Sequence, residues 1–121
     1  MARRWRDKFA EAGRGVRQAA AEQSSFRVHL AAAALVTALA AWLRCPPLEW
    51  CLLIGCVAGV FAAEIFNSAL ETLFHALDDA TKARMHGCLD QAAGAVLVGA
   101  AGAAIIGALI LGPRLLTLAG Y

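Results

Sequence analysis

The chain has 121 residues, 60% of them hydrophobic, and a net charge of only +2. A chain of this length forms one domain at most, here residues 1–121, and a soluble fold of this size cannot bury so much apolar surface. Because there is no basic patch with interleaved aromatic residues, the charge gives no basis for nucleic-acid binding. The composition therefore favours an all-α membrane protein.

The first predicted element is an amphipathic helix over about residues 3–24. Arginine and lysine are spread through this segment, and Trp5, Phe9 and Val16 share one side of it if it is helical. No apolar stretch of about 7–15 residues follows directly, so the segment is not typical of a cleaved secretory signal. We predict a helix on the membrane surface. The alternative is a frayed, solvated basic tail.

Three apolar blocks follow in the sequence, at residues 28–43, 48–66 and 92–111. Each is near the roughly 20 residues with which a helix crosses a bilayer, although the first block is short. The third block contains no charged residue. The pattern predicts three membrane-spanning helices.

Two connections separate the blocks. Pro46 and Pro47 predict a tight turn between the first two, which makes those helices antiparallel neighbours. The polar stretch 78–87 is predicted to be partly helical, with a break near Gly87. Because most basic residues precede the first block, the N-terminus is expected in the cytoplasm and the C-terminus outside.

Small residues recur at helix-packing spacing in the last two spans. Gly55 and Gly59 form a GxxxG pair, and Gly99, Ala103 and Gly107 continue the same spacing in the third span. Such residues let helices approach closely, either within one chain or between chains. Three helices offer little room for an intramembrane site, so a homo-oligomer with sites between subunits is favoured.

A polar stripe crosses the end of the second span. At about 100° per residue, Glu64, Asn67 and Glu71 fall within an arc of roughly 60° on one helix face. Continuing the same helix adds His75 and Asp78. An ionisable residue inside the bilayer is costly, so its first interpretation is functional.

The stripe contains the groups that phosphoryl transfer needs. Glu64, slightly inside the bilayer, is suited to general-base work on a hydroxyl presented from the lipid. Glu71, nearer the water, is placed to bind a divalent cation through carboxylate oxygen. Asn67 lies between them and can orient a phosphate. The alternative is a purely structural stripe in which Asn67 joins helices and Glu71 is solvated.

Three stretches carry a resemblance to a known family. Glu64-Ile-Phe-Asn-Ser-Ala-Leu-Glu71 is similar to the signature of the small prokaryotic diacylglycerol kinases, a family that also contains the undecaprenol kinases. Ser25-Phe-Arg-Val-His-Leu30 resembles the family segment that enters the first span, with a histidine like that of the undecaprenol kinase branch. Asp90-Gln-Ala-Ala-Gly94 resembles the entry to the third span. The resemblance covers nearly the whole chain.

The resemblance implies a homotrimer of the bacterial inner membrane. Its members transfer the γ-phosphate of Mg-ATP to a lipid hydroxyl, at sites between subunits. Carried over by position, Glu64 is the catalytic base and Asn67 a positioning residue of the site. Glu71 and Glu22 bind Mg²⁺, and with Asp90 they form the ATP site.

This chain departs from the family pattern at two positions of the site. Leu89 stands where the family normally has a lysine that meets the ATP phosphates, and Gln23 stands where it has a metal-binding acid, with Glu22 one position earlier. If Glu22 takes over through a local shift of the helix, the metal site survives. The candidates to replace the missing lysine are Arg84, Lys82, Arg14 and Arg17.

The sequence leaves the acceptor open between diacylglycerol and undecaprenol, because apolar pockets discriminate poorly between chains. It also leaves open a catalytically weak or inactive member with a structural or regulatory role. A proton or ion pathway is disfavoured, since the outer halves of the spans offer no further acids. His29 is expected to be an ordinary interfacial histidine, and His86 a loop residue.

Overall fold

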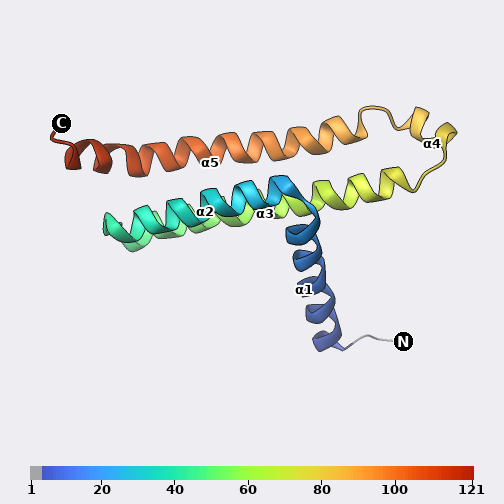
Figure 1. The fold of residues 1–121 in the computed structure, drawn as a ribbon, viewed down its shortest axis with the longest axis horizontal. Helices are drawn as coiled ribbons and strands as arrows, with labels where there is room; N and C mark the ends of the chain where they lie inside the picture. Colours follow the sequence, from blue (N-terminus) through green and yellow to red (C-terminus); the bar gives the residue numbers. More distant parts are fainter. Residues whose placement is uncertain (1–3) are drawn as a thin grey trace.

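The computed structural model describes residues 4–121, and in that range every regular element is a helix. The helices are α1 (Trp5–Glu22), α2 (Ser24–Trp42), α3 (Pro47–His75), α4 (Asp79–Arg84) and α5 (Cys88–Leu118). In Figure 1, α2, α3 and α5 run along the long axis of the molecule, whereas α1 points steeply away from them. The all-α prediction is confirmed.

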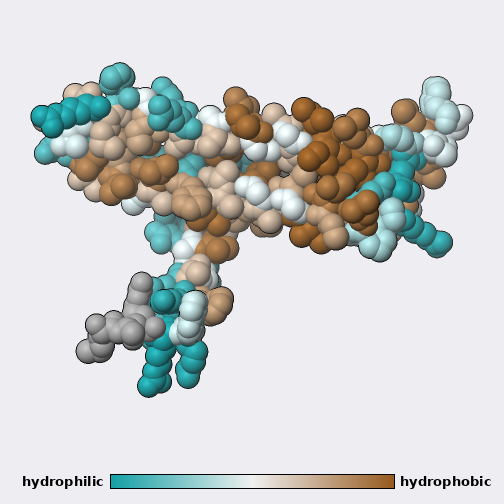
Figure 2. All heavy atoms as spheres, turned by 180° about the vertical axis from the view of Figure 1, so that it is seen from behind, coloured by the Kyte–Doolittle hydropathy of each residue, from teal (hydrophilic) through white to brown (hydrophobic). Residues whose placement is uncertain are grey.

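By length and composition, α2, α3 and α5 can each cross a membrane. Each predicted span coincides with one of these three candidate helices, and α3 and α5 extend beyond their apolar blocks at both ends. The 29 residues of α3 reach roughly 44 Å, more than the roughly 30 Å of hydrocarbon in a bilayer. The part of α3 beyond the apolar block carries Asn67 and Glu71, whereas Glu64 lies inside the block. Figure 2 shows apolar atoms over much of the body and hydrophilic atoms at both of its ends and on α1.

A one-residue break separates α1 from α2. Gln23 has extended backbone angles, which ends α1 at Glu22 and lets α2 start at Ser24 in a new direction. Nη2 of Arg27 donates to the carbonyl oxygen of Ala21 over 2.6 Å, which occupies one of the carbonyls left unpaired at the end of α1. The break therefore places the start of α2 against α3, where the polar stripe lies.

The predicted tight turn between α2 and α3 is present at Pro46 and Pro47. Pro47 is in the first turn of α3, where its missing N–H costs no helical hydrogen bond. Arg44 takes a positive φ of 55°, which reverses the chain. A small apolar cluster lies beside this turn and includes Ala40, Leu53 and Leu111, from three different helices.

The region between α3 and α5 corrects one expectation and confirms another. Helix α3 ends at His75, so Asp78 does not continue the polar stripe. It is instead the N-cap of α4, and its carboxylate accepts a 2.7 Å hydrogen bond from the main-chain N–H of Thr81. Gly87 has a φ of 87° immediately before α5, which is the predicted break. Helix α5 continues through Pro113 to Leu118, beyond the expected end at residue 111.

The glycines of the two small-residue ladders face open space within the single chain. A Cβ atom added at Gly55, Gly59, Gly99 or Gly107 would meet no other atom within 4 Å. These glycines therefore do not serve close helix contact inside one chain, and the surfaces that they form are available to another chain or to lipid.

Candidate functional site

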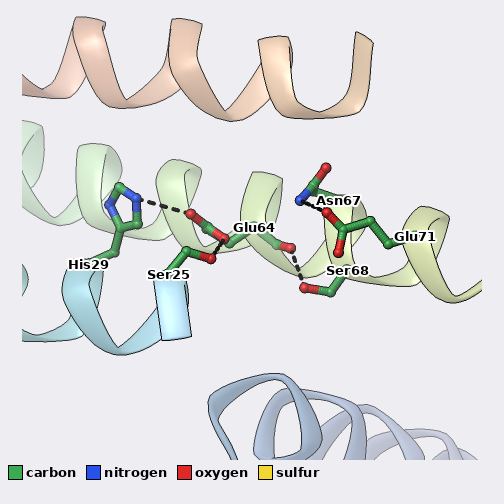
Figure 3. A network of polar contacts seen from close by, with 6 residues as sticks. All are labelled: Ser25, His29, Glu64, Asn67, Ser68 and Glu71. Carbon is green, nitrogen blue, oxygen red and sulfur yellow. Dashed lines mark hydrogen bonds and ion pairs between the residues drawn. The ribbon is translucent and has the colours of Figure 1, made fainter. Parts of the chain in front are cut away.

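Glu64 is the centre of the polar network and the only charged side chain that is buried among residues 4–121. Only 2% of its surface is exposed, and its carboxylate points from α3 toward α2 (Figure 3). The hydroxyl of Ser25 donates to Oε2 over 3.0 Å, and Nε2 of His29 lies 3.0 Å from Oε1. Each carboxylate oxygen therefore has its own partner on α2.

The position of these partners follows from the local sequence. Ser25 and His29 are four residues apart, so they lie one above the other on the same face of α2. Between them, Phe26 is buried and stacks on Phe61 of α3, with ring centroids 4.9 Å apart. The aromatic pair fixes the distance between the two helices next to Glu64.

The main chain of Glu64 is engaged as well. The hydroxyl of Ser68 donates to the carbonyl oxygen of Glu64 over 3.0 Å, one helical turn further along α3. This bond is of the common type in which serine bonds back to the carbonyl four residues earlier. It touches the backbone of Glu64 and leaves the carboxylate to Ser25 and His29 (Figure 3).

Asn67 and Glu71 form a second polar pair on the same side of α3. Nδ2 of Asn67 donates to Oε1 of Glu71 over 3.2 Å. Oδ1 of Asn67 is buried and has no hydrogen-bond partner in the part of the chain that the structure describes. It points away from Glu71 (Figure 3). Buried oxygens without a partner are unusual in proteins, so Oδ1 of Asn67 is available to accept a hydrogen bond from a group outside this chain.

Glu22 and Asp90 lie apart from Glu64, Asn67 and Glu71 in the single chain. Glu22 is exposed at the end of α1 and accepts a 3.4 Å hydrogen bond from Gln18. Asp90 is exposed in the first turn of α5. Over the described range 4–121, neither forms a hydrogen bond or ion pair with Glu64 or Glu71. Their predicted roles with the metal and the nucleotide stay predictions.

The basic candidates are distributed over two elements. Arg14 and Arg17 are exposed on α1, and Arg84 is exposed at the end of α4. Nζ of Lys82 lies 5.8 Å from the ring centroid of Phe74, a cation–π distance that holds α4 against the end of α3. Among the candidates to replace the missing lysine, Lys82 is thus the one with a defined contact, to Phe74 on the helix that carries Glu71.

His29 is the side chain of this network that the sequence interpretation missed. It was expected to be an ordinary interfacial residue, but its ring contacts the buried carboxylate at 3.0 Å. The four-residue spacing from Ser25 was a usable signal, because it places two polar groups on one face of an otherwise apolar helix. That signal did not say which helix the face meets.

An apolar cavity of about 200 Å³ opens next to His29, between α2, α3 and α5. Its other walls are aliphatic, aromatic or small side chains, among them Ala33, Val57, Phe61 and Ala103. The imidazole of His29 is the one strongly polar group in this lining. The cavity therefore suits the apolar part of a molecule whose polar end lies at His29.

Comparison with known proteins gives two matches. The sequence pattern of the family described as "Prokaryotic diacylglycerol kinase" matches residues 10–111. The chain is also 34% identical over 107 residues to an undecaprenol kinase of Bacillus subtilis (strain 168), covering 88% of this chain and 87% of that protein. No solved structure matches the chain. The matched residues of the family include the whole network around Glu64.

Proposed function

The chain belongs to the prokaryotic diacylglycerol kinase family and is a membrane lipid kinase, and from this premise we propose that it phosphorylates undecaprenol with Mg-ATP. Diacylglycerol is the second candidate acceptor. The observation that carries the proposal is Glu64, a buried carboxylate on a membrane-spanning helix whose two oxygens are held by Ser25 and His29. The relative that is an undecaprenol kinase supports the choice of acceptor.

Glu64 acts as the general base in this proposal. The lipid hydroxyl gives its proton to the carboxylate, and the oxygen forms a bond to the γ-phosphorus of ATP. The bond between that phosphorus and the bridging oxygen of the β-phosphate breaks, and ADP leaves with the electron pair. Each carboxylate oxygen has a second lone pair besides the one used by its partner on α2, so the base can accept this proton.

The acceptor needs an apolar path to the base. The cavity next to His29 could provide this path, because it is lined by His29, which contacts Glu64, and lies between three apolar helices. A cavity of about 200 Å³ holds only part of a long lipid, so the rest of the chain would extend into the bilayer.

The oxygen donors of the second pair suit a magnesium ion. Mg²⁺ prefers carboxylate and amide oxygens and keeps several ligands from water and substrate phosphates. Glu71 would hold it, with Glu22 as the predicted second carboxylate, and Asn67 would orient Glu71 through the hydrogen bond from its Nδ2 to Oε1. When bound, the ion neutralises charge on the transferring phosphate. No group of three metal-ligating side chains forms within residues 4–121, so substrate, water or another subunit would complete the shell.

The nucleotide would lie on the cytoplasmic side, where Asp90 opens α5 and Lys82 is held on Phe74. We propose that the chain lies in a bacterial inner membrane with its N-terminus in the cytoplasm, because most basic residues precede the first span. The open glycine surfaces on α3 and α5 support a homotrimer. In this assembly, Glu22 or Asp90 of a neighbouring chain would lie next to Asn67 and Glu71. Chemical cross-linking in native membranes tests this assembly, and a chain that stays monomeric would contradict it.

Phosphate transfer from labelled ATP in mixed micelles tests the function. The native protein is expected to label undecaprenol more readily than diacylglycerol, and Glu64→Gln is expected to abolish labelling of both. Asp79→Asn is the matched control, because it makes the same carboxylate-to-amide change at an exposed position of α4. If folded native protein labels neither lipid, the proposal is wrong.

Leu89 favours one alternative, a weak or inactive member with a structural role. It is half-buried in the first turn of α5, directly before Asp90, where the family resemblance expects a phosphate-binding lysine. The same labelling experiment separates the two, because an inactive member transfers no phosphate with either lipid.

A further inference from the structure

Two side chains of α2 divide the carboxylate of Glu64 between them. Ser25 donates to Oε2 and His29 contacts Oε1, both at 3.0 Å. An ionised carboxylate only accepts hydrogen bonds, so a hydrogen bond between His29 and ionised Glu64 requires the proton on Nε2. A hydrogen bond to one oxygen and an ion-pair contact to the other restrain the plane of the carboxylate as well as its position, which a single contact would not do.

We infer that Ser25 and His29 are positioning residues of the kinase reaction, which orient the base Glu64 toward the lipid hydroxyl. The inference rests on the proposed function. A buried carboxylate without donors carries a large desolvation cost and has no defined orientation. With both donors in place, the lone pairs that remain point in fixed directions, and the base needs no rearrangement when the acceptor arrives.

His29 has a second contact that Ser25 lacks. It also lines the apolar cavity, so one side of the imidazole meets the base and another meets the space that suits the acceptor. An acceptor whose chain occupies this cavity would bring its hydroxyl past His29 to reach Glu64. We therefore expect loss of His29 to affect turnover more strongly than loss of Ser25.

A purely structural tie between α2 and α3 is the alternative explanation of the same bonds. The Phe26–Phe61 stack already joins these helices beside Glu64, and Phe26 is 5% exposed. A structural tie would be visible as a lower unfolding midpoint and as equal effects on all kinetic constants. A positioning role lowers kcat and leaves the KM for ATP and the unfolding midpoint near their native values.

The test compares four variants of the full chain in mixed micelles, with ATP, Mg²⁺ and undecaprenol. For His29→Leu, kcat is expected to fall about 100-fold, because a small misplacement of a reacting group costs about that much. Ser25→Ala is expected to lower kcat about tenfold. His29→Gln keeps an N–H donor and should recover most of the loss. Ser68→Ala is the matched control, since it removes a hydroxyl that bonds the backbone of Glu64 at the same 3.0 Å.

Native kcat in both His29→Leu and Ser25→Ala, with Glu64→Gln inactive, would overturn the inference and leave the proposed function standing. Equal losses in Ser25→Ala and Ser68→Ala would also overturn it, because the carboxylate would then not be the group that matters. A native protein without any lipid phosphorylation would instead overturn the proposed function, and the inference with it.

Discussion

Nη2 of Arg114 lies 2.7 Å from Oε2 of Glu49, and this contact joins the end of α5 to the first turn of α3. The two side chains are 34% and 25% exposed, so the pair is partly withdrawn from solvent. Figure 1 shows the start of α3 and the end of α5 at the end of the bundle away from α1 and α4. The network around Glu64 joins α2 to α3, and the Arg114–Glu49 pair joins α3 to α5.

Removing one partner of this pair is expected to destabilise the chain. Arg114→Leu removes the cation that faces Glu49, and because both side chains are partly exposed the expected loss is about 1 kcal/mol. Arg114→Lys keeps the charge but loses the planar guanidinium, so its effect should be smaller. Denaturation in mixed micelles measures the free energy of unfolding. An unchanged midpoint for Arg114→Leu would show that the pair contributes no stability.

The same pair bears on Cys45, which lies between α2 and α3. Burial raises the pKa of the Cys45 thiol, a hydrogen bond with Glu49 raises it further, and the charge of Arg114 opposes these effects. A raised pKa means less thiolate at a given pH, so alkylation should be slow and should reach half its maximal rate above the ordinary value of 9.0. A chain with its other cysteines replaced by alanine isolates this thiol.

Two variants give the sign of each contribution to the reactivity of Cys45. Glu49→Gln removes a negative charge near the thiol, so the midpoint of alkylation should move to lower pH. Arg114→Leu removes the opposing positive charge, so the midpoint should move to higher pH. Shifts in the same direction for both variants would contradict this electrostatic account.

The N-cap of α4 gives a second pH dependence. Hydrogen bonds from the side chain and the main-chain N–H of Thr81 hold the pKa of the Asp78 carboxyl below its usual 3.8. A lowered pKa contributes stability above the unfolded value, and this contribution is lost as the pH falls through the folded value. The amide resonance of Thr81 should therefore titrate with a midpoint below 3.8. In Asp78→Asn, which keeps an N-cap, this titration should disappear.

Much of the fold and half of the site follow from the sequence for identifiable reasons. Apolar blocks of membrane-spanning length predict three helices because a bilayer requires them, and helical periodicity alone places Glu64, Asn67 and Glu71 on one side. The His29–Glu64 contact joins two helices and depends on how α2 is rotated against α3, which no single-helix pattern contains.

The ends of the helices were harder to predict than their existence. Asp78 was expected to extend the stripe because it has the right spacing, but the chain leaves the helix after His75 and the aspartate caps α4 instead. At the other end, the last span was expected to end at residue 111, shortly before Pro113. Helix α5 continues through it, and Thr117 Oγ1 bonds the carbonyl oxygen of Pro113 over 2.9 Å. The spacing of residues along the sequence does not determine whether a helix ends, as α3 does at His75, or continues, as α5 does through Pro113.

The second polar pair predicts a defect in magnesium use. Glu71→Gln removes the charge of a proposed Mg²⁺ ligand and should raise the Mg²⁺ concentration for half-maximal kinase activity about tenfold or more. Asn67→Leu removes the N–H that holds Oε1 of Glu71 and should act in the same direction. Thr72→Ala, one residue further along α3, is the control, because its hydroxyl only bonds the carbonyl of Ser68. An unchanged Mg²⁺ requirement in both variants would exclude Glu71 as a ligand and Asn67 as the residue that orients it.

The departures at Leu89 and Gln23 predict that the native enzyme can be improved. Leu89→Lys places a cation directly before Asp90 in the first turn of α5, where the resemblance expects a contact with the ATP phosphates. A charge-assisted hydrogen bond of this kind contributes about 1.5–3 kcal/mol, so kcat/KM for ATP should rise about 10- to 150-fold. Adding Gln23→Glu to Leu89→Lys should also lower the Mg²⁺ concentration for half-maximal activity, because it restores an acid at the junction of α1 and α2. Leu89→Met is the control for size without charge. If Leu89→Lys leaves kcat/KM unchanged, another cation already serves the phosphates, and Lys82 on Phe74 is then the residue to substitute next.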